Sequence, residues 1–146
     1  MKASKILFPT DFSHTGDAAL ELATSLARDA GAMLLIVHAE EPPLAYGGGE
    51  LYYGIPDPST KEIRNMLEQV RPADPTVNYE HRMVTGEPAA AIVRLADSEN
   101  VDMIVMGTHG RGGISRMLMG SVAEAIVRRA TCPVLTVKQP ERAAVV

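Results

Sequence analysis

The sequence contains a single cysteine, Cys132, among its 146 residues. One cysteine excludes an intramolecular disulfide and fits a reducing compartment such as the cytoplasm. Because Cys132 precedes Pro133 at the start of an apolar run, we expect a buried, unreactive thiol rather than a nucleophile. Metal-ligand spacing is missing as well, since His14, His81 and His109 lie far apart. We therefore predict no metal site built by the protein alone.

Long apolar runs and an excess of positive charge are also missing. The longest apolar runs, 33–37 and 103–106, are far shorter than the roughly 20 residues of a transmembrane helix. A basic start at 1–5 is followed by only three apolar residues before Pro9, too few for a signal peptide. The net charge of -4 argues against nucleic acid as the main partner. We expect a cytoplasmic protein that binds neither membrane nor nucleic acid.

Two common phosphate-binding motifs are absent. A Walker A loop requires a Gly-Lys pair, and the chain contains none. The dinucleotide motif G-x-G-x-x-G requires a spacing that Gly107 and Gly110 do not have. Both motifs are therefore excluded.

A third arrangement of the same kind is present over residues 101–124, VDMIVMGTHGRGGISRMLMGSVAE. An apolar strand pattern, a glycine-rich span and a helical pattern follow one another, and this order places backbone N–H groups and a helix dipole against phosphate. The pattern G-x-x-G-x9-G-S is completed by Gly107, Gly110, Gly120 and Ser121. The structural alternative is a capping box from Ser121 to Glu124, with Gly107 as a plain strand-end turn. The two interpretations are compatible, because a capped helix keeps free N–H groups in its first turn.

Strand and helix patterns alternate along the chain. The second strand is nearly all apolar, which favours a parallel sheet covered on both faces. Helical crossovers then predict an open α/β sheet with helices on both faces, in one domain over 1–146. We expect strands over 5–9, 33–39, 77–84, 103–106 and 134–137. We expect helices capped by Ser13 or Thr15, over about 60–70, from Pro88 to near Asn100, and from Ser121 to Arg129.

Finer features of these helices also follow from the pattern. Gly31 is suited to the left-handed residue that closes the first helix. In the last helix we expect Val122, Ala125 and Ile126 to face inward. The proline- and glycine-rich span 42–59 is predicted to be a flexible loop over a ligand or partner, or else a disordered excursion. Residues 139–146 are predicted to form a loose tail.

Nearly the whole chain, from Ile6-Leu7-Phe8-Pro9-Thr10-Asp11 to Pro133–Val137, resembles the universal stress protein family. At its four motif positions the chain resembles the subgroup of this family that binds ATP. The resemblance implies strand order 3-2-1-4-5 in a Rossmann-like fold of the adenine nucleotide alpha hydrolase-like type. It also implies a homodimer that pairs the last strand, Val134–Val137, which is an edge strand with free backbone groups.

The resemblance further implies a set of nucleotide-binding residues. Adenosine contacts would come from Pro9, Thr10, Asp11 and Ala39, with Gly107 near the ribose and Gly86 close by. Phosphate contacts would come from Gly110, Gly120, Ser121 and Val122, with His109 and Arg111 as weaker candidates. Asp11 has a competing role as a turn carboxylate, and His38 is expected to be a hydrogen-bonded core or edge histidine.

Three functions compete at this stage. The first is an ATP-binding regulatory protein of the stress response, with ATP, ADP or AMP as ligand and Mg²⁺ or Mn²⁺ held through the phosphates. The second is a slow metal-dependent ATP hydrolase, for which Asp11 and His109 are the candidates to position water. The third is a protein-interaction or chaperone-like module that uses the loop at 41–59, with a vestigial nucleotide site and an unknown protein partner.

Overall fold

The computed structural model describes residues 3–41, 60–108 and 120–140. The predicted loop at 42–59 and most of the predicted tail, 141–146, lie outside the described residues. Three predicted site residues, His109, Gly110 and Arg111, lie outside them too.

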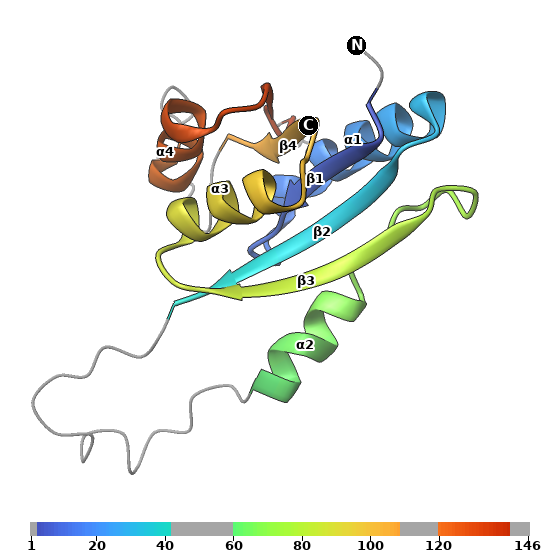
Figure 1. Cartoon of the computed structure of the whole chain (residues 1–146). Helices are drawn as coiled ribbons and strands as arrows, with labels where there is room; N and C mark the ends of the chain where they lie inside the picture. Colours follow the sequence, from blue (N-terminus) through green and yellow to red (C-terminus); the bar gives the residue numbers. More distant parts are fainter. Residues whose placement is uncertain (1–2, 42–59, 109–119, 141–146) are drawn as a thin grey trace, which may run out of the picture.

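The described strands form one sheet in which every neighbouring pair is parallel (Figure 1). The strands are β1 (Lys5–Pro9), β2 (Met33–Glu40), β3 (Tyr79–Thr85), β4 (Met103–Gly107) and β5 (Val134–Val137). The helices are η1 (His14–Gly16), α1 (Asp17–Ala30), α2 (Thr60–Glu68), α3 (Pro88–Ser98) and α4 (Ser121–Arg129). The order β3-β2-β1-β4-β5 confirms the predicted fold class and strand order.

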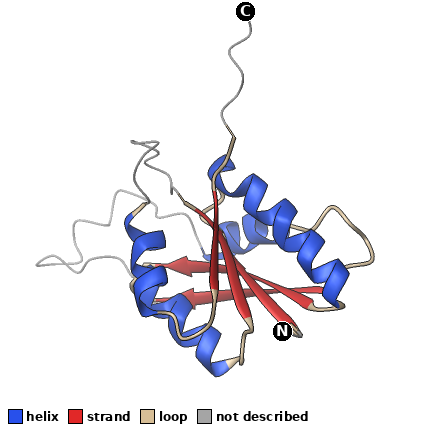
Figure 2. Cartoon of the chain, turned by 90° about the horizontal axis from the view of Figure 1, so that it is seen from above, coloured by secondary structure: helices blue, strands red, loops and turns tan. Residues whose placement is uncertain are grey.

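Helices cover both faces of the sheet (Figure 2). Alternation along β2 sends Leu34 and Ile36 to the core beneath α1 and α2. Leu35 and Val37 point to the second core, beneath α3 and α4. All four side chains are fully buried. Such two-sided burial is the reason for the nearly continuous apolar sequence of this strand.

Several predicted boundaries are wrong by a few residues. The strand predicted from Val77 begins at Tyr79, because the Asp74 carboxylate binds both the amide and the hydroxyl of Thr76 and folds the chain into a turn there. The helix predicted over about 60–70 ends at Glu68. Gly31 closes α1 at φ 64°, as predicted. Asn100 takes the left-handed conformation after α3, at φ 54°.

The predicted cap of α1 is wrong, because neither Ser13 nor Thr15 caps the helix. The Ser13 hydroxyl donates to Asp11 Oδ1 instead, and the 3₁₀ turn η1 precedes α1. The first-turn amide of Ala18 donates to Oε1 of Gln139, 121 residues away in sequence, at 2.7 Å. Gln139, the first residue of the predicted loose tail, therefore contacts the start of α1.

Cys132 is half-buried rather than buried. Burial raises the pKa of its thiol above the usual value. A raised pKa leaves less thiolate at neutral pH, in line with the expected lack of reactivity.

Candidate functional site

The carboxyl ends of β1 and β4 lie side by side, at the edge of the sheet where the parallel strands end. The two strands pair in parallel, with Leu7 opposite Ile104. From β1 the chain crosses through α1 to β2 on one side, whereas β4 and β5 lie on the other. Strand order reverses at this point, and open parallel sheets bind ligands in the crevice outside such a reversal. Pro9 and Gly107, two predicted site residues, end these strands.

A tightly bonded turn, which we call the β1–α1 turn (residues 10–16), follows β1. The amide of Thr10 donates to the carbonyl oxygen of Val37 at 2.8 Å. Thr10 Oγ1 accepts from the amide of Phe12 at 3.0 Å. Phe12 has a φ of 69°, a value rarely adopted by a residue with a bulky side chain. No sequence signal marks this backbone conformation, and sequence reasoning did not single out Phe12.

Asp11 is at the centre of the β1–α1 turn. Its Oδ1 accepts from the amide of Ser13 at 2.9 Å and from the Ser13 hydroxyl at 2.5 Å. The competing prediction of a turn carboxylate is therefore confirmed for Oδ1. Both hydrogen bonds that described residues make to this carboxylate use Oδ1, so Oδ2 is not needed to build the turn.

Strand β2 contributes His38 and Ala39 to the same edge. His38 Nδ1 lies 2.9 Å from the carbonyl oxygen of Thr10, and its ring lies against that of Phe12 with centroids 4.4 Å apart. This confirms the expectation of a hydrogen-bonded histidine. Ala39 is half-buried and packs against the core beneath α3 and α4. Gly86, at φ 137°, donates its amide to the Glu40 carbonyl at the end of the same strand.

Gly107 brings β4 against the β1–α1 turn. A Cβ atom at this position would lie 2.8 Å from the carbonyl oxygen of Thr15 and 3.4 Å from Cα of Gly16. No ordinary side chain tolerates the shorter contact. The glycine at this motif position thus has a packing reason that does not depend on any ligand.

The start of α4 departs from the predicted capping box. Gly120 is the N-cap residue, Ser121 is the first helical residue, and no side chain of the described residues caps the helix. The Glu124 carboxylate binds Arg128 at 2.9 Å instead of reaching back. Val122 is 37% exposed and Ala123 is 4% exposed, so Ala123 takes the inward position predicted for Val122.

The amide of Gly120 is occupied, whereas those that follow it lack a side-chain partner. Gly120 donates to the carbonyl oxygen of Thr108 at 2.5 Å. The first N–H groups of a helix have no partner within the helix, and they carry its partial positive charge. Since no described side chain caps α4, the amides of Ser121 and Val122 suit an anion.

Helices α1 and α3 differ from α4 in that side chains bind amides of their first turns. At α3, the Glu87 carboxylate accepts from the amides of Ala90 and Ala89 at 2.9 and 3.2 Å. The Ala90 hydrogen bond is the main reason why the pKa of Glu87 is lowered. At α1, Gln139 occupies the amide of Ala18. Side chains thus bind first-turn amides of α1 and α3, whereas none from the described part of the chain caps α4.

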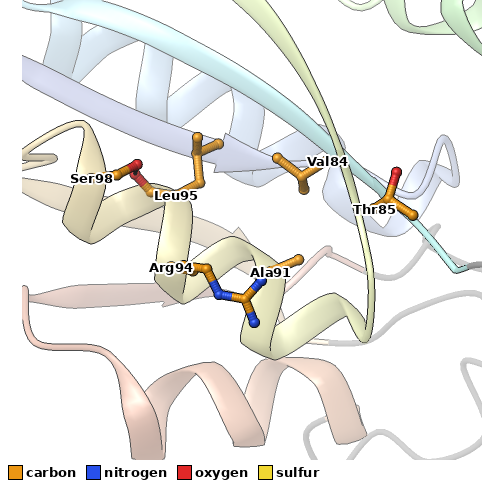
Figure 3. A pocket seen from close by; sticks show the side chains of 6 residues that line it. All are labelled: Val84, Thr85, Ala91, Arg94, Leu95 and Ser98. Atoms are coloured by element: carbon orange, nitrogen blue, oxygen red, sulfur yellow. Dashed lines mark hydrogen bonds between the residues drawn. The ribbon is translucent and has the colours of Figure 1, made fainter.

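A cavity of about 350 Å³ lies elsewhere, between α3 and the edge strand β3 (Figure 3). It is lined by Val84, Thr85, Ala91, Arg94, Leu95 and Ser98. None of the predicted site residues lines it. The cavity is therefore separate from the crevice beside β1 and β4.

The described residues fall in the ranges 3–41, 60–108 and 120–140. Within them, no group of three or more His, Cys, Asp or Glu side chains is arranged to hold a metal ion. Within the same ranges, none of the helices has the length and apolar character needed to span a membrane.

Comparison with known proteins identifies the family of this chain and relatives with the same fold. A model of the universal stress protein family matches residues 2–138. Universal stress protein MJ0531 of Methanocaldococcus jannaschii is 33% identical over 147 residues, covering 94% of this chain and 84% of the relative. The structure of MJ0577 from the same organism has a TM-score of 0.82 at 29% identity, covering 97% and 100% of the two chains. A universal stress protein in complex with cAMP has a TM-score of 0.65 at 28% identity, covering 94% and 98%. The chain belongs to the universal stress protein family.

Proposed function

We propose that this protein binds an adenine nucleotide in the crevice beside β1 and β4, with the phosphate at the start of α4. One observation carries the proposal. Among the described residues, no side chain binds the first-turn amides of α4, whereas Glu87 and Gln139 occupy first-turn amides of the neighbouring helices. Support comes from the related structure in complex with cAMP, an adenine nucleotide, at 28% identity.

Each end of the ligand has a chemically suited partner in this proposal. Asp11 Oδ2 accepts from a ribose hydroxyl, since Oδ1 is used by the turn. The amides of Ser121 and Val122 donate to phosphate, with charge-assisted bonds that are stronger than neutral ones. Adenosine lies against Pro9, Thr10 and Ala39, which reach the same edge.

The motif residues Gly107, Gly110, Gly120 and Ser121 resemble the ATP-binding subgroup, so we propose ATP, ADP or AMP as the ligand. Gly110 would contact phosphate, with His109 and Arg111 as weaker candidates, whereas the Gly120 amide is already bound to Thr108. A divalent ion such as Mg²⁺ or Mn²⁺ would be held through the phosphate oxygens and would neutralise part of their charge. Regulation by nucleotide binding is the role that we propose, in a cytoplasmic protein of the stress response.

We also propose a homodimer through β5. Within the described residues, β5 pairs with β4 alone and leaves its other edge open. Leu135 on this strand is 38% exposed, which is high for a leucine in a sheet. Pairing with a second copy would satisfy the open backbone groups and cover this side chain.

The test of nucleotide binding removes a single donor atom. Ser121→Pro deletes the N–H at the first helical position, where proline is well tolerated. Gly120, at φ -61° and ψ 155°, already has the extended backbone that a residue before proline prefers. Ser121→Ala is the matched control, because it removes the hydroxyl and keeps the amide.

Isothermal titration calorimetry with AMP, ADP, ATP, cAMP and GTP provides the readout. We expect the adenine nucleotides to bind and GTP to bind more weakly or not at all. Loss of one charge-assisted bond predicts affinity about tenfold to a hundredfold weaker for Ser121→Pro. Ser121→Ala should stay within a few-fold of the unmodified protein. Equal affinity of Ser121→Pro and the unmodified protein would place the phosphate elsewhere.

A further inference from the structure

We propose that His38 is a positioning residue of the nucleotide site and fixes the direction in which Asp11 faces the ligand. This inference rests on the proposed function and deepens it. His38 lies on β2, and its side chain contacts Thr10 and Phe12. These are the two residues that flank Asp11 in the sequence.

The two contacts act on opposite ends of the same short segment. A carbonyl oxygen only accepts, so Nδ1 of His38 carries the hydrogen and donates to Thr10 at 2.9 Å. The face of the imidazole ring lies against the Phe12 ring, with centroids 4.4 Å apart and planes tilted by 33°. One side chain from a neighbouring strand thus holds the backbone before Asp11 and the side chain after it.

The conformation of Phe12 shows that the β1–α1 turn needs outside support. A φ of 69° is strained for phenylalanine and persists where surrounding contacts hold it in place. The local hydrogen bond from the Phe12 amide to Thr10 Oγ1 belongs to the turn itself. His38 adds contacts from a different strand, 28 residues away in sequence. Removing them would let the turn populate other conformations, and Asp11 would then leave the position that the proposed ribose contact requires.

The chain offers a matched control in His81 on β3. Its Nε2 lies 2.8 Å from the carbonyl oxygen of Val70, and its ring contacts Tyr79 with centroids 5.4 Å apart. Both histidines are half-buried and both bind a backbone carbonyl. His81, however, holds the segment between α2 and β3, which contributes no predicted site residue.

The experiment compares three variants, His38→Leu, His38→Asn and His81→Leu. Asparagine places an N–H donor close to the position of imidazole Nδ1, whereas leucine has no donor. AMP affinity is measured by titration calorimetry, and unfolding temperature by calorimetric scanning. Amide hydrogen exchange of Phe12 and Ser13 is followed by NMR without nucleotide.

We expect His38→Leu to speed exchange of both amides and to weaken AMP binding about tenfold, because the competent turn would fall to about a tenth of the population. His38→Asn should recover most of the affinity. His81→Leu should lower the unfolding temperature to a similar degree and leave AMP affinity and both amides unchanged. Binding that falls equally in His38→Leu and His81→Leu would reduce His38 to a general contribution to stability.

Two further outcomes separate this inference from the proposed function. Unchanged exchange of the Phe12 and Ser13 amides in His38→Leu would overturn the positioning role, whatever the nucleotide does. An unmodified protein that binds no adenine nucleotide would overturn the proposed function and the ligand part of this inference together. The exchange data would then still decide whether His38 holds the turn.

Discussion

The carbonyl oxygen of Thr15 occupies the space into which a side chain on Gly107 would extend. An ideal Cβ on Gly107 would lie 2.8 Å from this oxygen, and both atoms that would collide are attached directly to backbone. The contact joins the end of β4 to the β1–α1 turn, so it sets how closely the two sides of the candidate crevice approach. Gly107 therefore packs against the later part of the β1–α1 turn, at Thr15, and His38 contacts its first residue, Thr10.

Replacing Gly107 with alanine should destabilise the fold by about 1–3 kcal/mol, because neither backbone can yield without moving a whole element. Urea unfolding measures this change. Gly31→Ala is the comparison, since a Cβ there meets nothing within 4 Å and the cost comes only from its φ of 64°. We expect Gly31→Asn to recover much of that loss, because asparagine tolerates the left-handed conformation. A Gly107→Ala protein as stable as the unmodified one would show that the contact is not rigid.

The second prediction concerns Asp102, which binds the start of β1 from the end of the sheet away from the crevice. Its Oδ2 accepts from the amide of Ser4 at 2.8 Å, and from the Ser4 hydroxyl and the Lys5 amide at 3.0 Å each. The Ser4 amide is the main reason why the pKa of Asp102 lies below its ordinary value. A carboxylate with a lowered folded pKa stabilises the protein above its unfolded pKa, and this contribution is lost as pH falls through the folded pKa.

We therefore expect Asp102→Asn to lower the free energy of unfolding by about 1 kcal/mol at neutral pH. The difference from the unmodified protein should shrink as pH falls from about 4, the ordinary pKa of an aspartate, to the lower folded value. Urea unfolding at a series of pH values measures both quantities. A constant difference across this range would mean that the charge of Asp102 has no part in the effect.

The third prediction concerns the cap that Gln139 provides for α1. Its Oε1 accepts from the Ala18 amide at 2.7 Å, and no side chain at the N-cap position does so. Gln139→Ala should cost about 0.5–1 kcal/mol, the usual range for loss of an exposed cap. That loss corresponds to an unfolding temperature about 2–4 °C lower. Gln139→Glu should restore the stability or raise it, because a carboxylate interacts more favourably with the positive end of the helix.

Much of the fold could be predicted from the sequence because buried strands have a local signature. The apolar run of β2 and the helices between strands indicated a parallel α/β sheet, while the resemblance to the family supplied the strand order. Helix starts were harder to predict. The cap of α1 comes from Gln139, and the N-cap residue of α4 bonds to Thr108. Neither contact has a local signal, so the sequence instead favours Ser13 or Thr15 as the cap of α1 and offers Ser121 as a possible cap of α4.

The candidate site shows the same division. Glycine spacing marked the candidate phosphate loop, because backbone approach to an anion requires small residues in a fixed pattern. The left-handed conformation of Phe12 had no such mark, since phenylalanine is a poor choice for that region. The Phe12 amide binds the Thr10 hydroxyl, and the Phe12 ring lies against His38 from another strand. Contacts between distant parts of the chain are the part of the site that the sequence left unpredicted.

The last prediction tests the proposed dimer. Leu135→Glu would place a charge against its counterpart across a β5–β5 interface, where burial without a partner is costly. We expect this variant to sediment as a monomer in analytical ultracentrifugation, whereas the unmodified protein sediments as a dimer. Leu22→Glu is the control, because Leu22 on α1 is 36% exposed and Leu135 is 38% exposed. If both variants remain dimeric, the subunits associate through a surface other than the open edge of β5.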